Sequence, residues 1–226
     1  MLQSTVDRVV EVFVADPALL SVGLSAFSSG LQVDLSGSFS VADTLIVRPD
    51  LDGNGTTEIA IVGDDNSGHS LVLLLEVDYA KGGEPQLVVM GQVVFGSERY
   101  PADPSSDVAL GDFNGDGNVD VAWSEHPDTN GGIVYLILGP LEGTYTSADA
   151  HGWITRGQAA YDTCDEADTP SCQHFGAAFG SALATLDHNG DGIDDLLIGA
   201  PFYETESPKH GPGAVFLFLG AEGSPW

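Results

Sequence analysis

One short acidic motif occurs three times in the chain, and this repeat limits the possible folds more than any other feature of the sequence. The three nonapeptides begin at Asp50, Asp112 and Asp187, so that their spacing is 62 residues and then 75. Each nonapeptide lies between apolar stretches rich in Val, Ile and Leu. Short apolar runs of this kind are typical of buried β-strands, and a unit repeated along a chain indicates a repeat architecture.

Each unit contains further strand-like segments. Gly68, Gly132 and Gly213 precede the apolar runs LVLLLEV, IVYLILG and AVFLFLG, and a fourth apolar element, QLVVMGQVVFG or GWITRGQ, comes before the next loop. Four short antiparallel strands make up a propeller blade, and closed propellers have about four to eight blades. The sequence therefore predicts an all-β fold, a partial β-propeller with about three four-stranded antiparallel blades plus part of another.

The nonapeptides carry the donors that calcium prefers. Counted from the first Asp, positions 1, 3, 5 and 9 have side-chain oxygens in all three loops, and position 6 is Gly. Calcium takes about six to eight oxygen ligands, Gly permits the positive φ that bends a chain around an ion, and position 7 offers its backbone carbonyl. The predicted Ca²⁺ ligands are the residues at positions 1, 3, 5, 7 and 9, namely Asp50, Asp52, Asn54, Thr56, Glu58, Asp112, Asn114, Asp116, Asn118, Asp120, Asp187, Asn189, Asp191, Ile193 and Asp195.

Two other interpretations of these loops were weighed. An EF-hand needs a bidentate Glu at position 12 and flanking helices, but position 12 is Ile61, Trp123 or Ile198 and the flanks are strand-like. Asp, Asn and Gly also favour metal-free turns. This alternative stays open above all for the first loop, which has Asn54 at position 5 and Glu58 at position 9.

The repeats divide the chain into four segments of one domain. We expect part of a preceding blade at 1–37, a blade with a degenerate calcium loop at 38–98, a blade with a calcium loop at 99–158, and a blade with the complete motif at 159–226. An incomplete ring exposes sheet edges that pair with another chain. The chain is therefore expected to be part of a larger propeller, or a half-ring that two copies complete.

The charge balance argues against several partners. The chain has 34 acidic and 6 basic residues, for a net charge of −28. Nucleic acids and anionic membranes are bound through Lys and Arg, so neither is expected, and no apolar run reaches the roughly 18 residues of a membrane helix. The first residues lack the basic and apolar regions of a secretory signal. We expect a chain cut from a longer precursor, or an artificial start at Met1.

No catalytic constellation is present in the sequence. Cys164 and Cys172 lie in one polar segment, where a local disulfide is expected if the protein is exported; two free thiols are the alternative. The six His residues are scattered without metal-ligand spacing. Trp123 and Trp153 are expected in the core or packed between blades, with a role as ligand platforms as the alternative. The sequence predicts no enzyme and no catalytic residues.

The third unit also contains residues typical of a known repeat. It reads FGSALATLDHNGDGIDDLLIGAP and strongly resembles the FG-GAP repeat of the N-terminal propeller of integrin α subunits and of integrin-like bacterial proteins. Phe179 and Gly180 match FG, and 199–201 match GAP. The second unit has Ser-Glu-His at 124–126 in place of GAP, and Pro104 in the Phe position. The resemblance covers roughly 38–220.

This resemblance implies a propeller with calcium in interstrand loops on one face, where the ions stiffen the structure and ligands bind through other loops. It leads us to expect a non-catalytic adhesion or recognition module, extracellular or at the cell surface, that binds a protein or glycan ligand there. Two alternatives stay open. One is an accessory propeller of a larger secreted enzyme, as FG-GAP-like propellers accompany phospholipases and polysaccharide lyases. The other is a half-ring that forms a homodimer.

Overall fold

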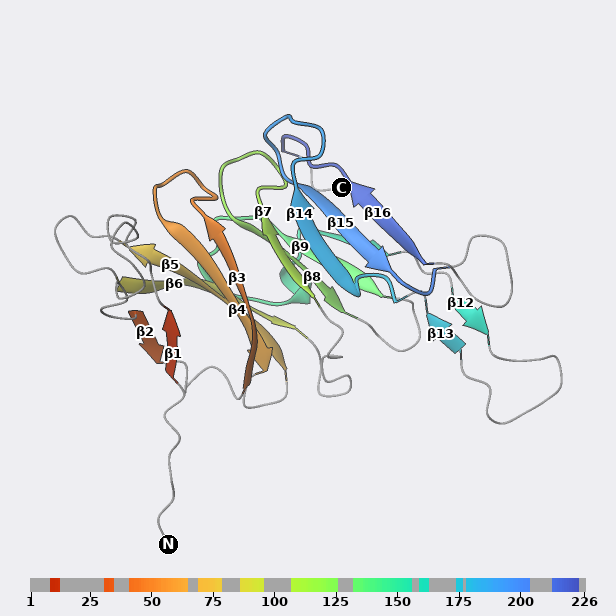
Figure 1. The fold of residues 1–226 in the computed structure, drawn as a ribbon, viewed down its shortest axis with the longest axis horizontal. Coiled ribbons are helices and arrows are strands. Elements are labelled where there is room, and N and C mark those ends of the chain that lie inside the picture. Colours follow the sequence, from red (N-terminus) through yellow and green to blue (C-terminus); the bar gives the residue numbers. More distant parts are fainter. Residues whose placement is uncertain are drawn as a thin grey trace, which may run out of the picture.

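The computed structural model of the 226-residue chain describes residues 9–12, 31–34, 41–64, 69–78, 86–95, 107–125, 132–155, 159–162, 174–176, 178–203 and 213–223. Within these ranges the protein is almost entirely β-structure, and its one helical turn is the 3-10 segment η1 (Ser147–Asp149). The predicted all-β, partial-propeller fold is confirmed. Three antiparallel sheets form the body of the molecule (Figure 1).

We call the three sheets by number in chain order. Sheet 1 consists of β3 (Val41–Pro49), β4 (Thr57–Asp64), β5 (Ser70–Asp78) and β6 (Gln86–Phe95). Sheet 2 consists of β7 (Val108–Gly111), β8 (Asp120–Glu125), β9 (Ile133–Ile137) and β11 (Gly152–Thr155). Sheet 3 consists of β14 (Ala182–Leu186), β15 (Asp195–Ala200) and β16 (Ala214–Phe218).

The remaining strands flank these sheets. β1 (Val9–Val12) pairs with β2 (Leu31–Asp34), and β12 (Ala159–Asp162) pairs with β13 (His174–Gly176). The short strand β10 (Gly143–Tyr145) adds to the β6 edge of sheet 1 in parallel orientation. The sequence pattern did not predict this pairing. Through it, the segment between β9 and β11 of sheet 2 is attached to sheet 1.

The first strands of the three sheets lie next to one another, with β7 beside both β3 and β14 (Figure 1). A first hydrophobic core lies between sheets 1 and 2 and contains Val72, Leu74, Val121 and Trp123. A second core lies between sheets 2 and 3. Each sheet therefore buries one face against its neighbour, as blades of a propeller do.

Matching positions of the three sheets have different surroundings. Leu74, Leu136 and Leu217 occupy equivalent cross-strand positions. The first two are 1% and 2% exposed in the two cores, whereas Leu217 is 38% exposed. The neighbouring Val215 is 71% exposed. Sheet 3 thus presents to solvent the apolar face that sheets 1 and 2 bury.

The two tryptophans expected between blades differ. Trp123 is fully buried and stacks on Tyr135, with ring centroids 5.2 Å apart, so its prediction is confirmed. Trp153 is 62% exposed, and its prediction is wrong. It lies on β11, the last strand of sheet 2, where alternate side chains point away from the protein.

Candidate metal-binding loops

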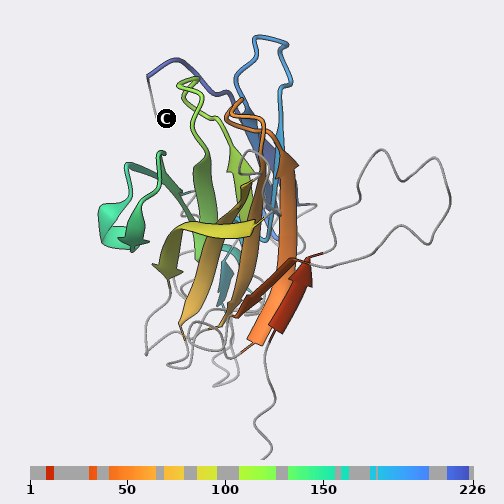
Figure 2. The ribbon, with the colours of Figure 1, turned by 90° about the vertical axis from the view of Figure 1, so that its left-hand side faces the viewer.

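Each acidic nonapeptide connects the first two strands of its sheet. Loop 1 (50–58) joins β3 to β4, loop 2 (112–120) joins β7 to β8, and loop 3 (187–195) joins β14 to β15. All three project from the same end of the sheets (Figure 1 and Figure 2). The hairpins place the predicted ligands on one side of the molecule.

The three loops share the same internal hydrogen bonds. The Gly N–H at position 6 donates to the Asp carboxylate at position 1, as from Gly117 to Asp112 Oδ2 at 2.9 Å, and equivalent bonds occur in loops 1 and 3. The N–H at position 7 donates to the side-chain oxygen at position 5, as from Asn118 to Asp116 Oδ1 at 2.8 Å, again in all three loops. The oxygens of positions 1 and 5 are thus turned inward.

Two glycines give each loop its curvature. Position 6 has positive φ in every loop, between 80° at Gly117 and 89° at Gly55. Position 4 is also Gly with positive φ, between 70° and 78°. Residues with a Cβ rarely adopt this region. The sequence analysis identified position 6 and missed position 4, although the same residue recurs there in all three loops.

The carboxylate at position 9 is buried at the base of each loop. Glu58, Asp120 and Asp195 are all fully buried, and each accepts a hydrogen bond from the backbone N–H at position 2 of its own loop, at 2.6 to 2.9 Å. Asp120 also accepts from Gly139 N–H and Asp195 from Gly220 N–H. In loops 2 and 3 this carboxylate therefore ties the loop to the connection that follows the third strand.

Burial raises the pKa of two of these carboxylates, Asp120 and Glu58. Desolvation raises the pKa of Asp120 to about 7, against the N–H bonds from Gly139 and Phe113, and the nearby Asp116 and Asp112 charges add to the rise. Burial also raises the pKa of Glu58, with smaller contributions from Asp52 and Glu76. A nearby cation would favour the ionised form of such carboxylates.

Asp116 at position 5 behaves differently. Its partial burial raises the pKa, but hydrogen bonds from Asn114 and Asn118 outweigh this effect and leave the pKa below its ordinary value. The carboxylate is therefore ionised at neutral pH. The amide donors of Asn114 and Asn118 hold it at 2.9 Å each.

Loop 1 has an additional acidic neighbour. Glu76 on β5 lies opposite Glu58 in the strand register. Its Oε1 accepts hydrogen bonds from Thr56 Oγ1 at 2.7 Å and from Asn54 Nδ2 at 3.2 Å. The equivalent positions of sheets 2 and 3 are occupied by leucines 138 and 219. Sequence analysis missed this residue because it lies 18 positions beyond the loop's last ligand.

The donor set fits a hard cation, although no compact metal cluster is built by acidic side chains alone. Among the described residues, no three His, Cys, Asp or Glu side chains are grouped as metal ligands. Each loop supplies mixed oxygens: carboxylates, the Asn amide oxygen, and the backbone carbonyl at position 7. Oxygen donors of these three kinds suit calcium. Asp120 already accepts two N–H bonds, but each carboxylate oxygen has a second lone pair.

The side chain at position 2 fixes two of the loops to the next sheet. Leu51 packs against the first core, and Phe113 is 1% exposed in the second. His188 at the same position of loop 3 is exposed. The side chain at position 2 is therefore exposed in loop 3 but covered in loops 1 and 2, because a neighbouring sheet packs against Leu51 and Phe113.

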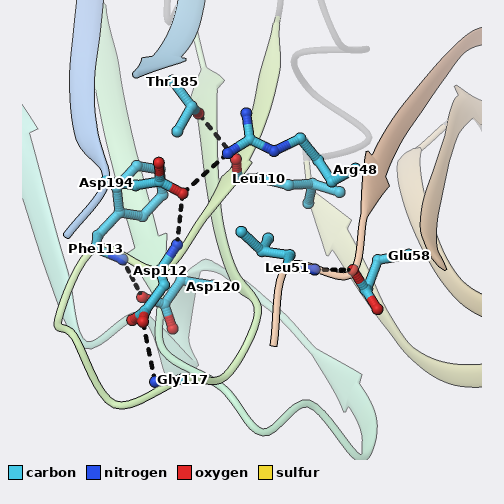
Figure 3. A network of polar contacts seen from close by, with 10 residues as sticks. All are labelled: Arg48, Leu51, Glu58, Leu110, Asp112, Phe113, Gly117, Asp120, Thr185 and Asp194. Carbon is cyan, nitrogen blue, oxygen red and sulfur yellow. Dashed lines mark hydrogen bonds and ion pairs between the residues drawn. The ribbon is translucent and has the colours of Figure 1, made fainter. Parts of the chain in front are cut away.

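Asp194, at position 8 of loop 3, connects all three sheets and was not identified from the sequence. Its Oδ2 accepts from the Asp112 N–H at 3.1 Å and forms an ion pair with Arg48 Nη2 at 3.0 Å (Figure 3). The Asp194 N–H also donates to the Asp112 carbonyl at 2.9 Å. Within the sequence of loop 3, only the two consecutive acids at positions 8 and 9 could have indicated this role of Asp194. Their different orientations depend on the neighbouring sheet.

The FG and GAP residues of the third unit form the contact between sheets 2 and 3. Phe179 is fully buried in the second core, and Ala200 is 1% exposed there. A Cβ on Gly180, which has φ 94°, would lie 2.6 Å from the Ser124 Cβ. Gly is therefore required at this close approach. The expected Cys164–Cys172 disulfide lies outside the described residues.

Within the ranges that the structure describes, no helix is long and apolar enough to cross a membrane. Comparison with known protein families finds one repeat in two parts of the chain. The FG-GAP repeat model matches residues 106–137 and 179–218.

Curated relatives include integrin α chains. Mouse (Mus musculus) integrin alpha-3 is 49% identical over 49 residues, which is 22% of this chain and 5% of the integrin. Integrin alpha-PS5 of Drosophila melanogaster is 32% identical over 140 residues, 59% of this chain and 12% of the integrin. Human (Homo sapiens) phosphatidylinositol-glycan-specific phospholipase D is 48% identical over 44 residues, 20% of this chain and 5% of the enzyme.

The alignments thus span at most about an eighth of these relatives' own length. The match to the repeat model includes loops 2 and 3 with their flanking strands. The chain therefore contains FG-GAP repeats at residues 106–137 and 179–218, and parts of the chain are similar to segments of integrin α chains.

Proposed function

We propose that the chain is a calcium-stiffened propeller segment that acts as a non-catalytic adhesion or recognition module at the cell surface or outside the cell. The observation that carries this proposal is the shared arrangement of the three loops, in which positions 1, 5 and 9 have the same hydrogen-bond partners. The similarity to integrin α chains supports a recognition role.

In this proposal, positions 1, 3, 5, 7 and 9 of each loop hold one Ca²⁺. The ion supplies positive charge to converging carboxylates, which otherwise repel each other. The position 9 carboxylate lies on the second strand of each hairpin and the position 1 carboxylate follows the first. A cation held by both would join the two strands at the end where the loops project. We retain the division into segments 1–37, 38–98, 99–158 and 159–226 as part of this proposal.

The test is a comparison of folding stability and ligand binding with and without calcium. A ligand that binds only the folded state stabilises it by about 2.7 kcal/mol at a concentration of 100 Kd. We expect the melting temperature to rise when millimolar calcium replaces excess chelator, and isothermal titration calorimetry to detect the binding. An unchanged melting temperature together with no binding heat would overturn the calcium proposal.

The recognition role needs its own assay. The protein, loaded with calcium, is passed over immobilised extracellular-matrix proteins and glycans, and the same chain in chelator is the control. Calcium-dependent binding to one ligand class is expected. Binding that is equal in chelator, or absent throughout, would contradict the recognition proposal without affecting the calcium proposal.

A second candidate role is self-association of an incomplete ring, and the exposed face of sheet 3 favours it. Val215 and Leu217 are exposed, whereas their equivalents Val134 and Leu136 are buried by the next sheet. Burying one such side chain contributes about 1.5–3 kcal/mol. On sheet 1 the opposite face is already buried, as Ile59 shows at 1% exposure. Two copies would therefore pair through their third sheets.

Light scattering distinguishes this role from a monomeric module. A mass of twice 23.5 kDa at micromolar concentration would support self-association, and a monomeric mass would exclude it. The similarity to a phospholipase D over 44 residues favours a third role, as the accessory part of a larger enzyme. That role predicts no turnover by these 226 residues and a catalytic domain elsewhere in a longer protein.

A further inference from the structure

Loop 3 holds the first residue of loop 2 through a single side chain and its own backbone. Both backbone groups of Asp112 are bonded to Asp194. The Asp112 N–H donates to Asp194 Oδ2 at 3.1 Å (Figure 3), and the Asp112 carbonyl accepts from the Asp194 N–H at 2.9 Å. Asp112 is position 1 of loop 2, and its carboxylate accepts from Gly117 at 2.9 Å. The orientation of this carboxylate therefore depends on a residue of the next sheet.

The segment after β16 extends this contact. The Ala221 N–H donates to the Phe113 carbonyl at 3.2 Å, and the Gly223 N–H donates to the Asn114 carbonyl at 2.9 Å. The carbonyls of the first three residues of loop 2 are thus all bonded to sheet 3 or to the residues directly after it. Hydrogen bonds from outside a loop reduce the conformations that it has to lose on binding.

Loop 1 does not have the same link to sheet 2. The residue equivalent to Asp194 is Val119, which is 4% exposed and has no carboxylate. Gly139 and Gly220 are equivalent because each donates to the position 9 carboxylate. The residue after Gly139 is Pro140, which has no N–H to donate. The link is therefore a property of loops 2 and 3 among the loops that the structure describes.

Arg48 of sheet 1 fixes the Asp194 carboxylate from the other side. Its Nη2 lies 3.0 Å from Asp194 Oδ2, and the exposed fractions of the two side chains are 28% and 15%. A partly buried carboxylate with a charged partner and an N–H donor has little freedom to rotate. Arg48 thus keeps Asp194 in the orientation that bonds Asp112.

We propose that Asp194 is a positioning residue that couples loops 2 and 3, so that calcium in one loop strengthens binding in the other. This inference rests on the proposed calcium function. Asp194 lies directly between Ile193 and Asp195, the ligands proposed for positions 7 and 9 of loop 3. An ion held on both sides fixes Asp194, and Asp194 fixes Asp112. Coupling between two binding sites is reciprocal.

Amide NMR resonances read the two loops separately. The N–H groups of Gly117 and Gly192 each donate to the first Asp of their own loop, so each resonance reports calcium binding at its own site. Asp191→Ala removes the exposed position 5 ligand of loop 3. In this variant we expect the calcium affinity of loop 2, measured at the Gly117 resonance, to be about tenfold weaker than in the wild-type chain. This is within the usual range of allosteric coupling.

The role of Asp194 is tested by repeating this comparison in an Asp194→Ala background. There, adding Asp191→Ala is expected to change the calcium affinity at Gly117 by less than about twofold, a small fraction of typical coupling. The matched control is Thr185→Val, which removes the hydrogen bond from Thr185 Oγ1 to the Leu110 carbonyl at 2.9 Å. This bond also joins sheets 2 and 3, but through strands β7 and β14 and without contacting a loop residue. The control background is expected to keep the tenfold effect.

Each outcome decides the inference. Coupling that persists unchanged in Asp194→Ala, or that is lost equally in Thr185→Val, overturns the role of Asp194. Calcium binding without coupling in the wild-type chain overturns the inference and leaves the proposed function intact, whereas no calcium binding at either loop overturns both. If Asp194→Ala does not fold, Arg48→Met takes its place, and an unchanged tenfold effect in that background overturns the inference.

Discussion

Phe179 meets Phe216 edge to face inside the second core, with ring centroids 5.4 Å apart and an interplanar angle of 64°. Phe216 in turn meets Tyr203 at 5.1 Å and 87°. Edge-to-face pairs of this kind add about 0.5–1.5 kcal/mol beyond the burial of their surface. The Phe of the FG motif therefore belongs to an aromatic cluster centred on Phe216, at the core between sheets 2 and 3.

The first prediction concerns this cluster. Phe179→Ala is expected to lower the free energy of unfolding by about 3–5 kcal/mol, because it removes a fully buried ring and leaves a cavity. Phe202→Ala is the matched control, since Phe202 is 51% exposed, and it is expected to cost less than about 1 kcal/mol. Urea unfolding in saturating calcium measures both. Equal losses in the two variants would show that Phe179 does not hold the sheets together.

The second prediction separates the two acids of loop 2. Asp120→Asn is expected to lower stability in chelator by about 1–3 kcal/mol, because the Asn amide can accept only one of the two N–H bonds from Phe113 and Gly139. Asp116 is exposed. Asp116→Asn is therefore expected to change the free energy of unfolding in chelator by less than about 0.5 kcal/mol. Both substitutions are expected to weaken calcium binding to loop 2, as reported by the amide resonance of Gly117.

Thermal unfolding in chelator and calcium titration measure these two effects independently. A large loss of apo stability in Asp116→Asn would mean that position 5 acts in folding and not in ion binding. Unaltered calcium affinity in both variants would remove positions 5 and 9 from the ligand set.

The third prediction tests a close backbone contact. A Cβ on Gly132, at φ 104°, would lie 2.0 Å from the Phe179 carbonyl oxygen, whereas one on Gly143, at φ 97°, would meet nothing within 4 Å. Both Ala substitutions place a Cβ on a residue with a strained φ, which costs about 1–3 kcal/mol. Gly132→Ala additionally forces sheets 2 and 3 apart, so its loss of unfolding free energy should clearly exceed that of Gly143→Ala. Similar losses would show that the two sheets separate without cost.

The fourth prediction concerns the exposed face of sheet 3. The double variant Val215→Lys and Leu217→Lys is expected to fold with a melting temperature near that of the wild-type chain, since both side chains already contact solvent. If the chain self-associates, the variant is expected to be monomeric by light scattering. Val134→Lys is the contrasting variant and is expected to unfold, because Val134 is 1% exposed. A strongly destabilised double variant would mean that the face is covered within the monomer.

The strands and loops could be predicted from the local sequence pattern, whereas the contacts between sheets could not. The apolar runs after Gly132 and Gly213 became β9 and β16 because alternating or continuous aliphatic residues decide strand formation locally. The positions of Asp194 and Glu76 depend on which side chains a neighbouring strand or sheet brings close. No periodicity within a nonapeptide contains that information.

Burial was similarly difficult to predict from one segment. Trp123 and Trp153 have comparable strand-like surroundings in the sequence, yet one is in the core and the other is exposed. The difference arises because β8 is a central strand and β11 an outer one. The side chains at position 2 of the loops also differ in exposure. Phe113 is covered by the following sheet, whereas no sheet among the described residues covers His188.

The exposed His188 has a consequence for the rate of ion exchange. Leu51 and Phe113 shield one side of loops 1 and 2 from water, whereas loop 3 has a polar residue there and is solvated on that side. If the loops hold calcium as proposed, we therefore expect loop 3 to release its ion first when calcium is removed. Stopped-flow chelation would then resolve a fast phase from loop 3, followed by slower phases as the remaining hairpins empty.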